Sequence, residues 1–273
     1  MISTITVLGQ GAMGSRMADR LDAAGFEVTR WSRSGSDITP REAVARADIA
    51  LAMLRDDEAS RDVWLDAEAG ALAGLKKGAI AIESSTLRPD CMRDLGEAAS
   101  RRGLAFLDAP VLGSRPQAEA GALVHLIGGV EEVVDRAQPL LKAVGAKQLH
   151  AGEIGAGASL KLIANTLFAT QVALLAELIG RARKLGLDPS ATVELLGATP
   201  LLSPGAAAAA SLMLAGQDDP MFPVNLVRKD LGYAIGEACE AMPIAVAASK
   251  AFGRAAAAGM GGANLTAVHR LYD

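Results

Sequence analysis

The stretch "VLGQGAMGSRMADRLDAAGFEV" (residues 7–28) decides the fold of this protein. It follows the strand-like run "STITVL" (residues 3–8), and its glycines Gly9, Gly11 and Gly14 form the pattern G-x-G-x-x-G. In such a loop the first glycine permits a tight turn, the second lets the backbone approach a pyrophosphate, and the third lets the helix pack closely on the sheet. The start of the helix offers free N–H groups and a partial positive charge to phosphates. Because an amphipathic helix and a second strand follow, the stretch predicts a dinucleotide-binding βαβ unit.

Short apolar runs alternate with helix-length segments through the first half of the chain. The runs that predict strands are residues 3–8, 26–31, 49–54, 79–84, 104–109 and 123–129, and residues 88–102 predict one of the intervening helices. This alternation is typical of a mainly parallel, doubly wound sheet. From the glycine-rich junction "HAGEIGAGAS" (residues 150–159) onward the pattern is helical. We therefore expect an α/β protein with an N-terminal Rossmann NADP-binding domain, residues 1–156, and an all-α C-terminal domain for substrate binding and oligomerisation, residues 157–273, joined by a long interdomain helix.

The end of the second predicted strand indicates which dinucleotide is bound. An NAD enzyme usually has an acidic residue there, which holds the ribose hydroxyls. This chain has Ser32, Arg33 and Ser34, with Arg30 nearby and no acidic residue before Asp37. A guanidinium flanked by two hydroxyls suits a ribose phosphate better than a bare diol. The sequence thus favours NADP, with NAD as the alternative, unless Arg33 is merely a solvated loop residue.

Composition and charge exclude several classes of protein. The 273 residues carry a formal net charge of −4 and are 51% hydrophobic, which suits a globular protein and argues against a nucleic-acid binder. The cysteines Cys91 and Cys239 match neither a zinc site nor a disulfide framework, and the N-terminus lacks the pattern of a secretory signal. We therefore expect a cytoplasmic protein. The three histidines lie in separate contexts, so no metal site is predicted.

Residues 162–180 are apolar and long enough to span a membrane, but Asn165, Gln171 and Glu177 are spread along them. A central helix surrounded by protein explains this segment better than a membrane span. Burial of such a helix against more than its own domain predicts a homodimer or homotetramer.

Lys161 lies at the start of this apolar segment, four residues before Asn165. Residues four apart share one face of a helix, about one turn apart. An ammonium there can give a proton to a carbonyl oxygen while hydride reaches the carbon, and the amide of Asn165 can hold the substrate or the lysine. The alternative is a lysine at a helix start whose ammonium extends into water.

Five sequence blocks, in order, resemble the β-hydroxyacid dehydrogenase family, which includes 3-hydroxyisobutyrate dehydrogenases and glyoxylate/succinic semialdehyde reductases. The blocks are the glycine loop, "ESSTLRPD" (residues 83–90), "DAPVLGSRPQAEAG" (108–121), "GAGASLKLIAN" (155–165) and "RKDLGYA" (228–234). The resemblance covers essentially the whole chain. It implies a two-domain oxidoreductase in which Lys161 and Asn165 are catalytic.

The resemblance also implies binding residues. The expected cofactor contacts are Gly9, Gln10, Gly11, Ala12, Met13, Gly14, Ser32, Arg33, Ser34, Met53, Leu54, Thr86 and Lys229. The expected substrate contacts are Thr86, Leu112, Gly113, Ser114, Phe222 and Asp230, with Phe222 as an aromatic wall of the pocket. A structural cluster at a helix start is the alternative for Phe222, Lys229 and Asp230.

The block at residues 108–121 departs from the commonest pattern of the family. Leu112 stands where a serine usually follows the Asp-Ala-Pro-Val run, and Ser114 stands where many members have a second glycine. The backbone N–H groups near Gly113 and the Ser114 hydroxyl can still bind a carboxylate. The expected substrate is a small carboxylate-bearing molecule, but Leu112 leaves open which one.

These observations predict an NADP(H)-preferring oxidoreductase that interconverts a small β-hydroxyacid and its semialdehyde, or reduces a glyoxylate-type substrate, with Lys161 as general acid/base. One alternative is an enzyme like 6-phosphogluconate dehydrogenase, which would have a histidine at Ala164. A second is an imine reductase, which usually has another residue at Lys161. A third is a non-catalytic dehydrogenase-like binding module. We expect no nucleic-acid partner and no membrane contact.

Overall fold

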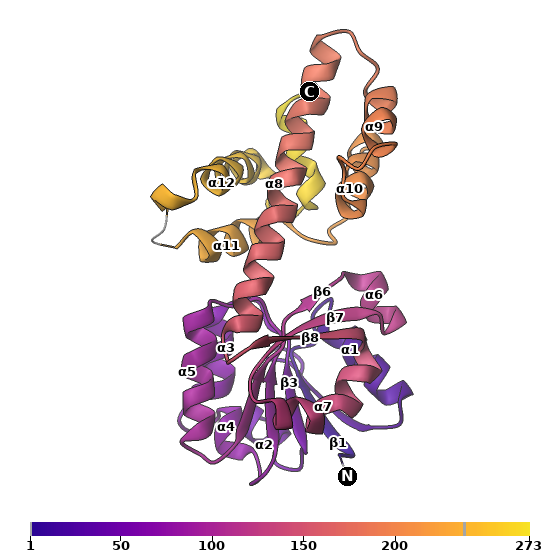
Figure 1. Cartoon of the computed structure of the whole chain (residues 1–273). Helices are drawn as coiled ribbons and strands as arrows, with labels where there is room; N and C mark the ends of the chain where they lie inside the picture. Colours follow the sequence, from indigo (N-terminus) through magenta and orange to yellow (C-terminus); the bar gives the residue numbers. More distant parts are fainter. Residues whose placement is uncertain (1, 237–238) are drawn as a thin grey trace. The chain divides into compact units, whose positions relative to one another are not determined.

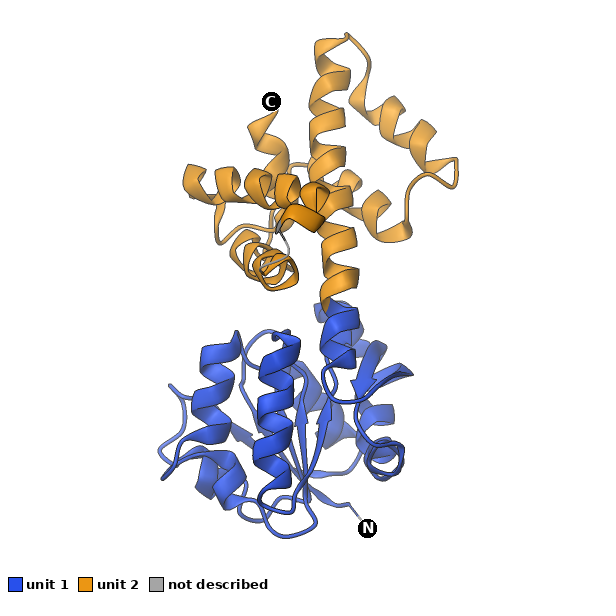
Figure 2. Ribbon diagram, turned by 60° about the vertical axis from the view of Figure 1, so that its left-hand side comes forward, with its two compact units in different colours: residues 1–161 blue, residues 162–273 orange. Residues whose placement is uncertain are grey.

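The computed structural model describes residues 2–236 and 239–273, and the chain divides into two compact units, residues 1–161 and 162–273 (Figure 2). The division falls inside one long helix, α8 (Ala156–Lys184), whereas the sequence places the boundary after the first residue of this helix. The first turn and a half of α8 therefore packs with the N-terminal unit.

Unit 1 is built on one eight-stranded sheet (Figure 1). Its strands are β1 (Thr4–Leu8), β2 (Glu27–Trp31), β3 (Ile49–Ala52), β4 (Ile80–Glu83), β5 (Ala105–Asp108), β6 (Val111–Leu112), β7 (Leu123–Gly128) and β8 (Gly145–Gly152). Their order across the sheet is β2-β1-β3-β4-β5-β7-β6, with β8 beside β7. Strands β1 to β5 are parallel, whereas β7 runs antiparallel to β5 and β6.

Helices cover both faces of this sheet. They are α1 (Gly14–Ala23), α2 (Pro40–Ala43), α3 (Asp57–Leu65), α4 (Ala71–Gly74), α5 (Pro89–Ser100), α6 (Arg115–Ala120) and α7 (Glu131–Val144). The central strands are apolar throughout because both faces are buried. In β3, Ile49 and Leu51 pack with α1 and α7, whereas Ala50 and Ala52 pack with α2 to α5. The doubly wound, mainly parallel fold predicted from the sequence is confirmed.

All six predicted strands are present, but β6 and β8 were not predicted. Strand β8 reads "GAKQLHAG" and lacks an apolar alternation, because most of its side chains are exposed. It is held by backbone pairing to β7. The junction at residues 150–159 is therefore not a free glycine-rich linker, since it contains the end of β8 and the first turn of α8.

Unit 2 is helical, as predicted. It contains the rest of α8 with α9 (Pro189–Gly197), α10 (Pro204–Leu214), α11 (Val224–Ile235) and α12 (Pro243–Ala255), and the short helices η1 (Cys239–Ala241), η2 (Ala256–Met260) and η3 (Leu265–Leu271). Small and branched side chains of α8, such as Ala169, Val172 and Ala176, pack in its core. Gly186, with φ +75°, ends α8 because a left-handed residue stops the helical pattern.

Protein does not surround α8 on all sides, so that expectation is wrong for the single chain. Ile163, Leu167 and Leu174 are 65, 62 and 54% exposed, because only one face of the helix packs in the core. Within the described part of the chain, α8 is the one helix whose length and composition would allow it to cross a membrane, a test that core helices of soluble proteins also pass.

Candidate active site

The predicted cofactor contacts of unit 1 all follow the carboxyl ends of neighbouring parallel strands. The glycine loop follows β1, Ser32 to Ser34 follow β2, Met53 and Leu54 follow β3, and Thr86 lies just beyond β4. The order β2-β1-β3-β4 brings these segments to one edge of the sheet. A change in the direction of winding occurs between β1 and β3, where open α/β sheets bind their ligands.

The three glycines of the loop have different surroundings. A Cβ atom on Gly9 would lie 2.3 Å from the Met53 carbonyl oxygen, and one on Gly14 would lie 2.0 Å from the Gly9 carbonyl oxygen. A Cβ on Gly11 would meet nothing within 4 Å. Gly9 and Gly14 are thus required by close packing of the backbone, whereas Gly11 faces open space. This arrangement fits the approach of a pyrophosphate to Gly11.

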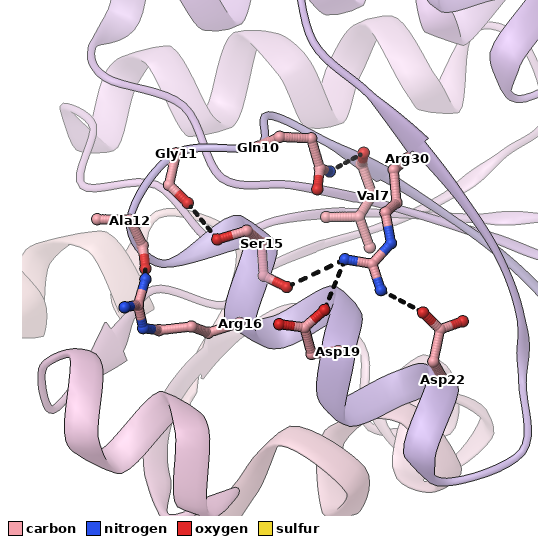
Figure 3. A network of polar contacts seen from close by, with 9 residues as sticks. All are labelled: Val7, Gln10, Gly11, Ala12, Ser15, Arg16, Asp19, Asp22 and Arg30. Carbon is pink, nitrogen blue, oxygen red and sulfur yellow. Dashed lines mark hydrogen bonds and ion pairs between the residues drawn. The ribbon is translucent and has the colours of Figure 1, made fainter. Parts of the chain in front are cut away.

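The start of α1 is suited to an anion. No side chain caps it and its first turn contains no acidic residue, whereas Asp56 caps α3 and Ser203 caps α10. The Gly11 carbonyl group of the loop is held by α1, because the Ser15 hydroxyl of this helix donates a hydrogen bond to it at 2.9 Å (Figure 3). The loop is therefore fixed while the N–H groups at the start of α1 have no side-chain cap.

Arg30 lies in β2 and Arg33 lies two residues after it, and the two arginines have different partners. Arg30 contacts Asp19 and Asp22 of α1, which raise the pKa of its guanidinium (Figure 3). Arg33 pairs with Asp62 of α3 at 3.0 Å, and both side chains are mostly exposed. An exposed ion pair of this kind is worth little and can exchange. Arg33, with a single exposed partner, is therefore less committed than Arg30, which has two.

A buried carboxyl group connects the loops after β3 and β4. Glu83 accepts hydrogen bonds from the Trp64 indole at 2.9 Å and the Ser85 backbone N–H at 2.9 Å, and it contacts the Ser60 hydroxyl. The Ser85 hydroxyl accepts the Leu54 backbone N–H at 2.6 Å. Burial raises the pKa of Glu83, and these donors act in the opposite direction. The network therefore fixes the segments after β3 and β4, both of which are predicted to bind the cofactor.

The predicted substrate loop begins after β5 and ends at α6. Leu112 is half-buried in β6, and Gly113 adopts φ +120°, a conformation that favours glycine. The Ser114 backbone N–H donates to Gln117 Oε1 at 2.9 Å. Ser114 and Gln117 form a capping box at the start of α6, in which the Ser114 hydroxyl oxygen faces the Gln117 backbone N–H. The buried hydroxyl donates to no acceptor among the described residues, so it could donate to a bound carboxylate.

Lys161 lies in the second turn of α8 and is half-buried. One turn earlier, the Ala158 backbone N–H donates to the Asp108 carboxylate at 2.9 Å. Asn165 lies one turn later on the same face of the helix, as its spacing predicts.

The predicted residues of unit 2 form a buried polar cluster. Asn165 Nδ2 donates to Asp230 Oδ2 at 2.7 Å, and Lys229 Nζ lies 3.0 Å from Asp230 Oδ1. The same ammonium lies 4.9 Å from the centre of the Tyr233 ring. Asp230 therefore orients both Asn165 and Lys229. Phe222 is half-buried against the core of unit 2, just before α11.

Among the described residues, no three acidic, histidine or cysteine side chains lie together in a group that could hold a metal ion.

Comparisons with known proteins identify the family. Residues 4–152 match the NAD binding domain of 6-phosphogluconate dehydrogenase, and residues 155–272 match the NAD-binding domain of NADP-dependent 3-hydroxyisobutyrate dehydrogenase. The chain is 32% identical to the chloroplastic glyoxylate/succinic semialdehyde reductase 2 of Arabidopsis thaliana, over 97% of this chain and 78% of that protein. The chain belongs to the β-hydroxyacid dehydrogenase family.

The chain is also similar to a solved dehydrogenase structure and to a nuclear protein. The structure of 3-hydroxyisobutyrate dehydrogenase from Mycobacterium tuberculosis has a TM-score of 0.87 and 28% identity, and 99% of each chain is covered. The cytokine-like nuclear factor N-PAC of Mus musculus is 31% identical over 98% of this chain, but the chain spans only 50% of that protein. This β-hydroxyacid dehydrogenase is an NAD(P)-dependent oxidoreductase acting on CH–OH groups.

Sequence reasoning did not assign roles to Glu83 and Asp108, the two acids that are 0% exposed among the described residues. Each ends an otherwise apolar strand run, "IAIE" and "AFLD". An acidic residue at the end of a buried strand was the available signal, because a carboxyl group at such a position needs partners.

Proposed function

We propose that this dehydrogenase interconverts a small β-hydroxyacid and its semialdehyde, or reduces a glyoxylate-type substrate, with NADP(H) and with Lys161 as general acid/base. The observation that carries the proposal is the placement of Lys161 and Asn165 on one face of α8, with the first turn of that helix held by Asp108. The similarity to a glyoxylate/succinic semialdehyde reductase supports the substrate class.

The glycine loop and the residues after β2 would hold NADPH, which would supply the hydride for the aldehyde carbon in the reducing direction. Lys161 then gives its proton to the carbonyl oxygen, so that the products are the hydroxyacid and NADP⁺. Asn165 has one amide hydrogen committed to Asp230, which fixes the orientation of the amide. Its carbonyl oxygen and second N–H can hold the substrate or the Lys161 ammonium.

The preference for NADP rests on Arg33. Its exposed pair with Asp62 can be exchanged for a ribose 2′-phosphate, which offers a doubly charged partner with better geometry. Ser32 and Ser34 flank the arginine and add hydroxyl donors. The second half of the chain matches a family that is described as NADP-dependent, which supports the same preference.

The substrate class rests on the loop after β5. The Ser114 hydroxyl and the backbone at Gly113 are the groups that would bind the acid end of the substrate. Leu112 contributes an apolar side chain where a hydroxyl is usual in the family, so the substrate carboxylate would be held by fewer donors. Thr86, Phe222 and Asp230 complete the proposed set of substrate contacts.

The decisive experiment replaces Lys161 with alanine. Loss of a general acid lowers turnover by about 100- to 10,000-fold, while NADPH still binds, because the glycine loop is unchanged. Lys184→Ala, an exposed change in the last turn of the same helix, serves as the matched control. Rates are measured with NADPH and NADH on a panel of semialdehydes, ketoacids and imines. Near-full activity of Lys161→Ala, or turnover of imines alone, would refute the proposal.

We further propose that the protein forms a homodimer or homotetramer and is cytoplasmic. The exposed face of α8, with Ile163, Leu167 and Leu174, supports assembly because such apolar side chains favour a partner surface. Light scattering that gives a monomer mass at micromolar concentration would contradict the proposed assembly.

Cys91, a buried free thiol, suits a reducing compartment, and the proposed substrate calls for neither a nucleic acid nor a membrane. Recovery of the protein from a membrane or secreted fraction would contradict the location.

A further inference from the structure

The end of β5 contains a buried carboxylate that the proposed chemistry does not use. Asp108 is fully buried, and its Oδ2 atom accepts the Ala158 backbone N–H at 2.9 Å. Ala158 lies 50 residues further along the chain, in the first turn of α8. The first N–H groups of a helix have no partner within the helix, so an acceptor from another element satisfies one of them.

Two glycines show that the backbone is shaped around this contact. A Cβ on Gly128 would lie 2.0 Å from Asp108 Oδ1, and a Cβ on Gly157 would lie 2.3 Å from the Leu126 carbonyl oxygen and 3.1 Å from that of Asp108. Any larger residue at either position would push the start of α8 away from β5 and β7. The close approach of the three segments is therefore a property that the sequence has to maintain.

We propose that Asp108 is a positioning residue, which fixes the first turn of α8, and with it Lys161, to the strand that leads into the predicted substrate loop. Ala158 and Lys161 are three residues apart, so they lie about one turn apart on neighbouring positions of the helix surface. Strand β5 ends at Asp108, and the chain reaches Leu112 to Ser114 only four to six residues later. One carboxylate thus links the proposed proton donor to the proposed carboxylate-binding loop. This inference rests on the proposed function of Lys161.

The electrostatics agree with this role. Burial raises the pKa of Asp108 to about 6, and the backbone N–H groups of Ala158, Gly155 and Gly128 act in the opposite direction. At neutral pH the group is mainly ionised, and a carboxylate at the start of a helix also interacts favourably with the helix dipole. The neighbouring acid Glu83, paired with Asp108 in register, has a separate set of partners.

The test compares Asp108→Asn and Asp108→Ala. A misplacement of a catalytic group by about 1 Å can cost about 100-fold in rate. We expect kcat to fall about 100-fold in Asp108→Ala, with the Kd for NADPH within about twofold of wild type, because Asp108 does not contact the glycine loop. Asp108→Asn keeps the shape and one acceptor for the Ala158 N–H, so it should restore a large part of kcat.

The matched control is Asp48→Asn. Asp48 also accepts two backbone N–H groups, those of Ser3 and Thr4, but at the opposite end of the sheet from the predicted site. This variant should lower the melting temperature and leave kcat and the Kd for NADPH unchanged. Wild-type kcat in folded Asp108→Ala, or equal losses of kcat and NADPH binding in both Asp108 variants, would overturn the proposal.

Hydrogen–deuterium exchange gives a readout that does not depend on turnover. The amides of residues 156–161 should exchange about tenfold faster in Asp108→Ala than in wild type, while the amides of the glycine loop stay unchanged. Unchanged exchange at residues 156–161 would refute the anchoring itself. If wild type turned over no hydroxyacid or semialdehyde, the proposed function would fail, and this exchange experiment would still decide whether Asp108 holds α8.

Discussion

Replacing Gly11 with alanine separates the binding role of the glycine loop from its structural role. A Cβ at Gly11 would meet no atom within 4 Å, and Gly11 is not among the glycines with positive φ. A Gly→Ala change at a compatible position stabilises a protein by about 0.4–1 kcal/mol, because it reduces the entropy of the unfolded chain. We therefore expect Gly11→Ala to fold at least as stably as wild type.

The same methyl group should obstruct the cofactor. It would occupy the space through which a pyrophosphate reaches the backbone, and each hydrogen bond to a charged group is worth about 1.5–3 kcal/mol. Loss of one such contact weakens binding by about 10- to 100-fold, and steric exclusion adds to this. We therefore expect the Kd for NADPH to rise at least about 100-fold.

Gly14→Ala is the matched comparison, because its Cβ would lie 2.0 Å from the Gly9 carbonyl oxygen. Overpacking of this kind costs about 1–3 kcal/mol, so this variant should lose stability as well as binding. Thermal unfolding measures the stability and isothermal titration calorimetry measures the Kd for NADPH. Two results would contradict the idea that a pyrophosphate occupies the open space beside Gly11. One is that Gly11→Ala binds NADPH as wild type does, and the other is that it is destabilised as much as Gly14→Ala.

Two other changes test the cofactor preference and a buried histidine. Arg33→Ala should raise the Kd for NADPH about 10- to 100-fold and leave that for NADH unchanged, and equal changes for both cofactors in titration calorimetry would contradict the role of Arg33. Burial lowers the pKa of His125 from 6.5 to about 4, so between these pH values the unfolded chain binds a proton that the folded protein does not. His125 should therefore make unfolding easier by about 3 kcal/mol as the pH falls from 6.5 to 4. Urea unfolding of wild type and His125→Leu at pH 7 and pH 4.5 measures this difference, and parallel pH dependence of the two proteins would refute it.

Much of the fold was predictable because its signals are local. Each central strand of unit 1 is an apolar run bounded by polar or turn residues, since both faces of the sheet are buried. Strand β8 was not predictable in this way, because its side chains are mostly exposed and its place is set by backbone pairing with β7. The exposed face of α8 was also missed, since an apolar sequence does not say which side chains find a partner.

In the candidate site, too, the features with local signals were predictable and those that depend on long-range packing were not. The glycine loop, the residues after β2 and the Lys161–Asn165 spacing follow from local geometry, because each depends on residues within one turn or one loop. The sequence alone therefore determined the fold class, the kind of cofactor and the candidate catalytic lysine. The roles of these residues remain predictions that the experiments above address.

Only the tertiary structure decided which polar groups act together. It assigned Arg30 to the acids of α1 and left Arg33 in an exposed pair, although Arg30 lies in β2 and Arg33 only two residues after it. It also joined Asp108 to Ala158 and Glu83 to Trp64. A buried carboxylate needs donors, but the sequence does not specify which distant N–H groups the packing of helices and strands will bring within hydrogen-bonding distance.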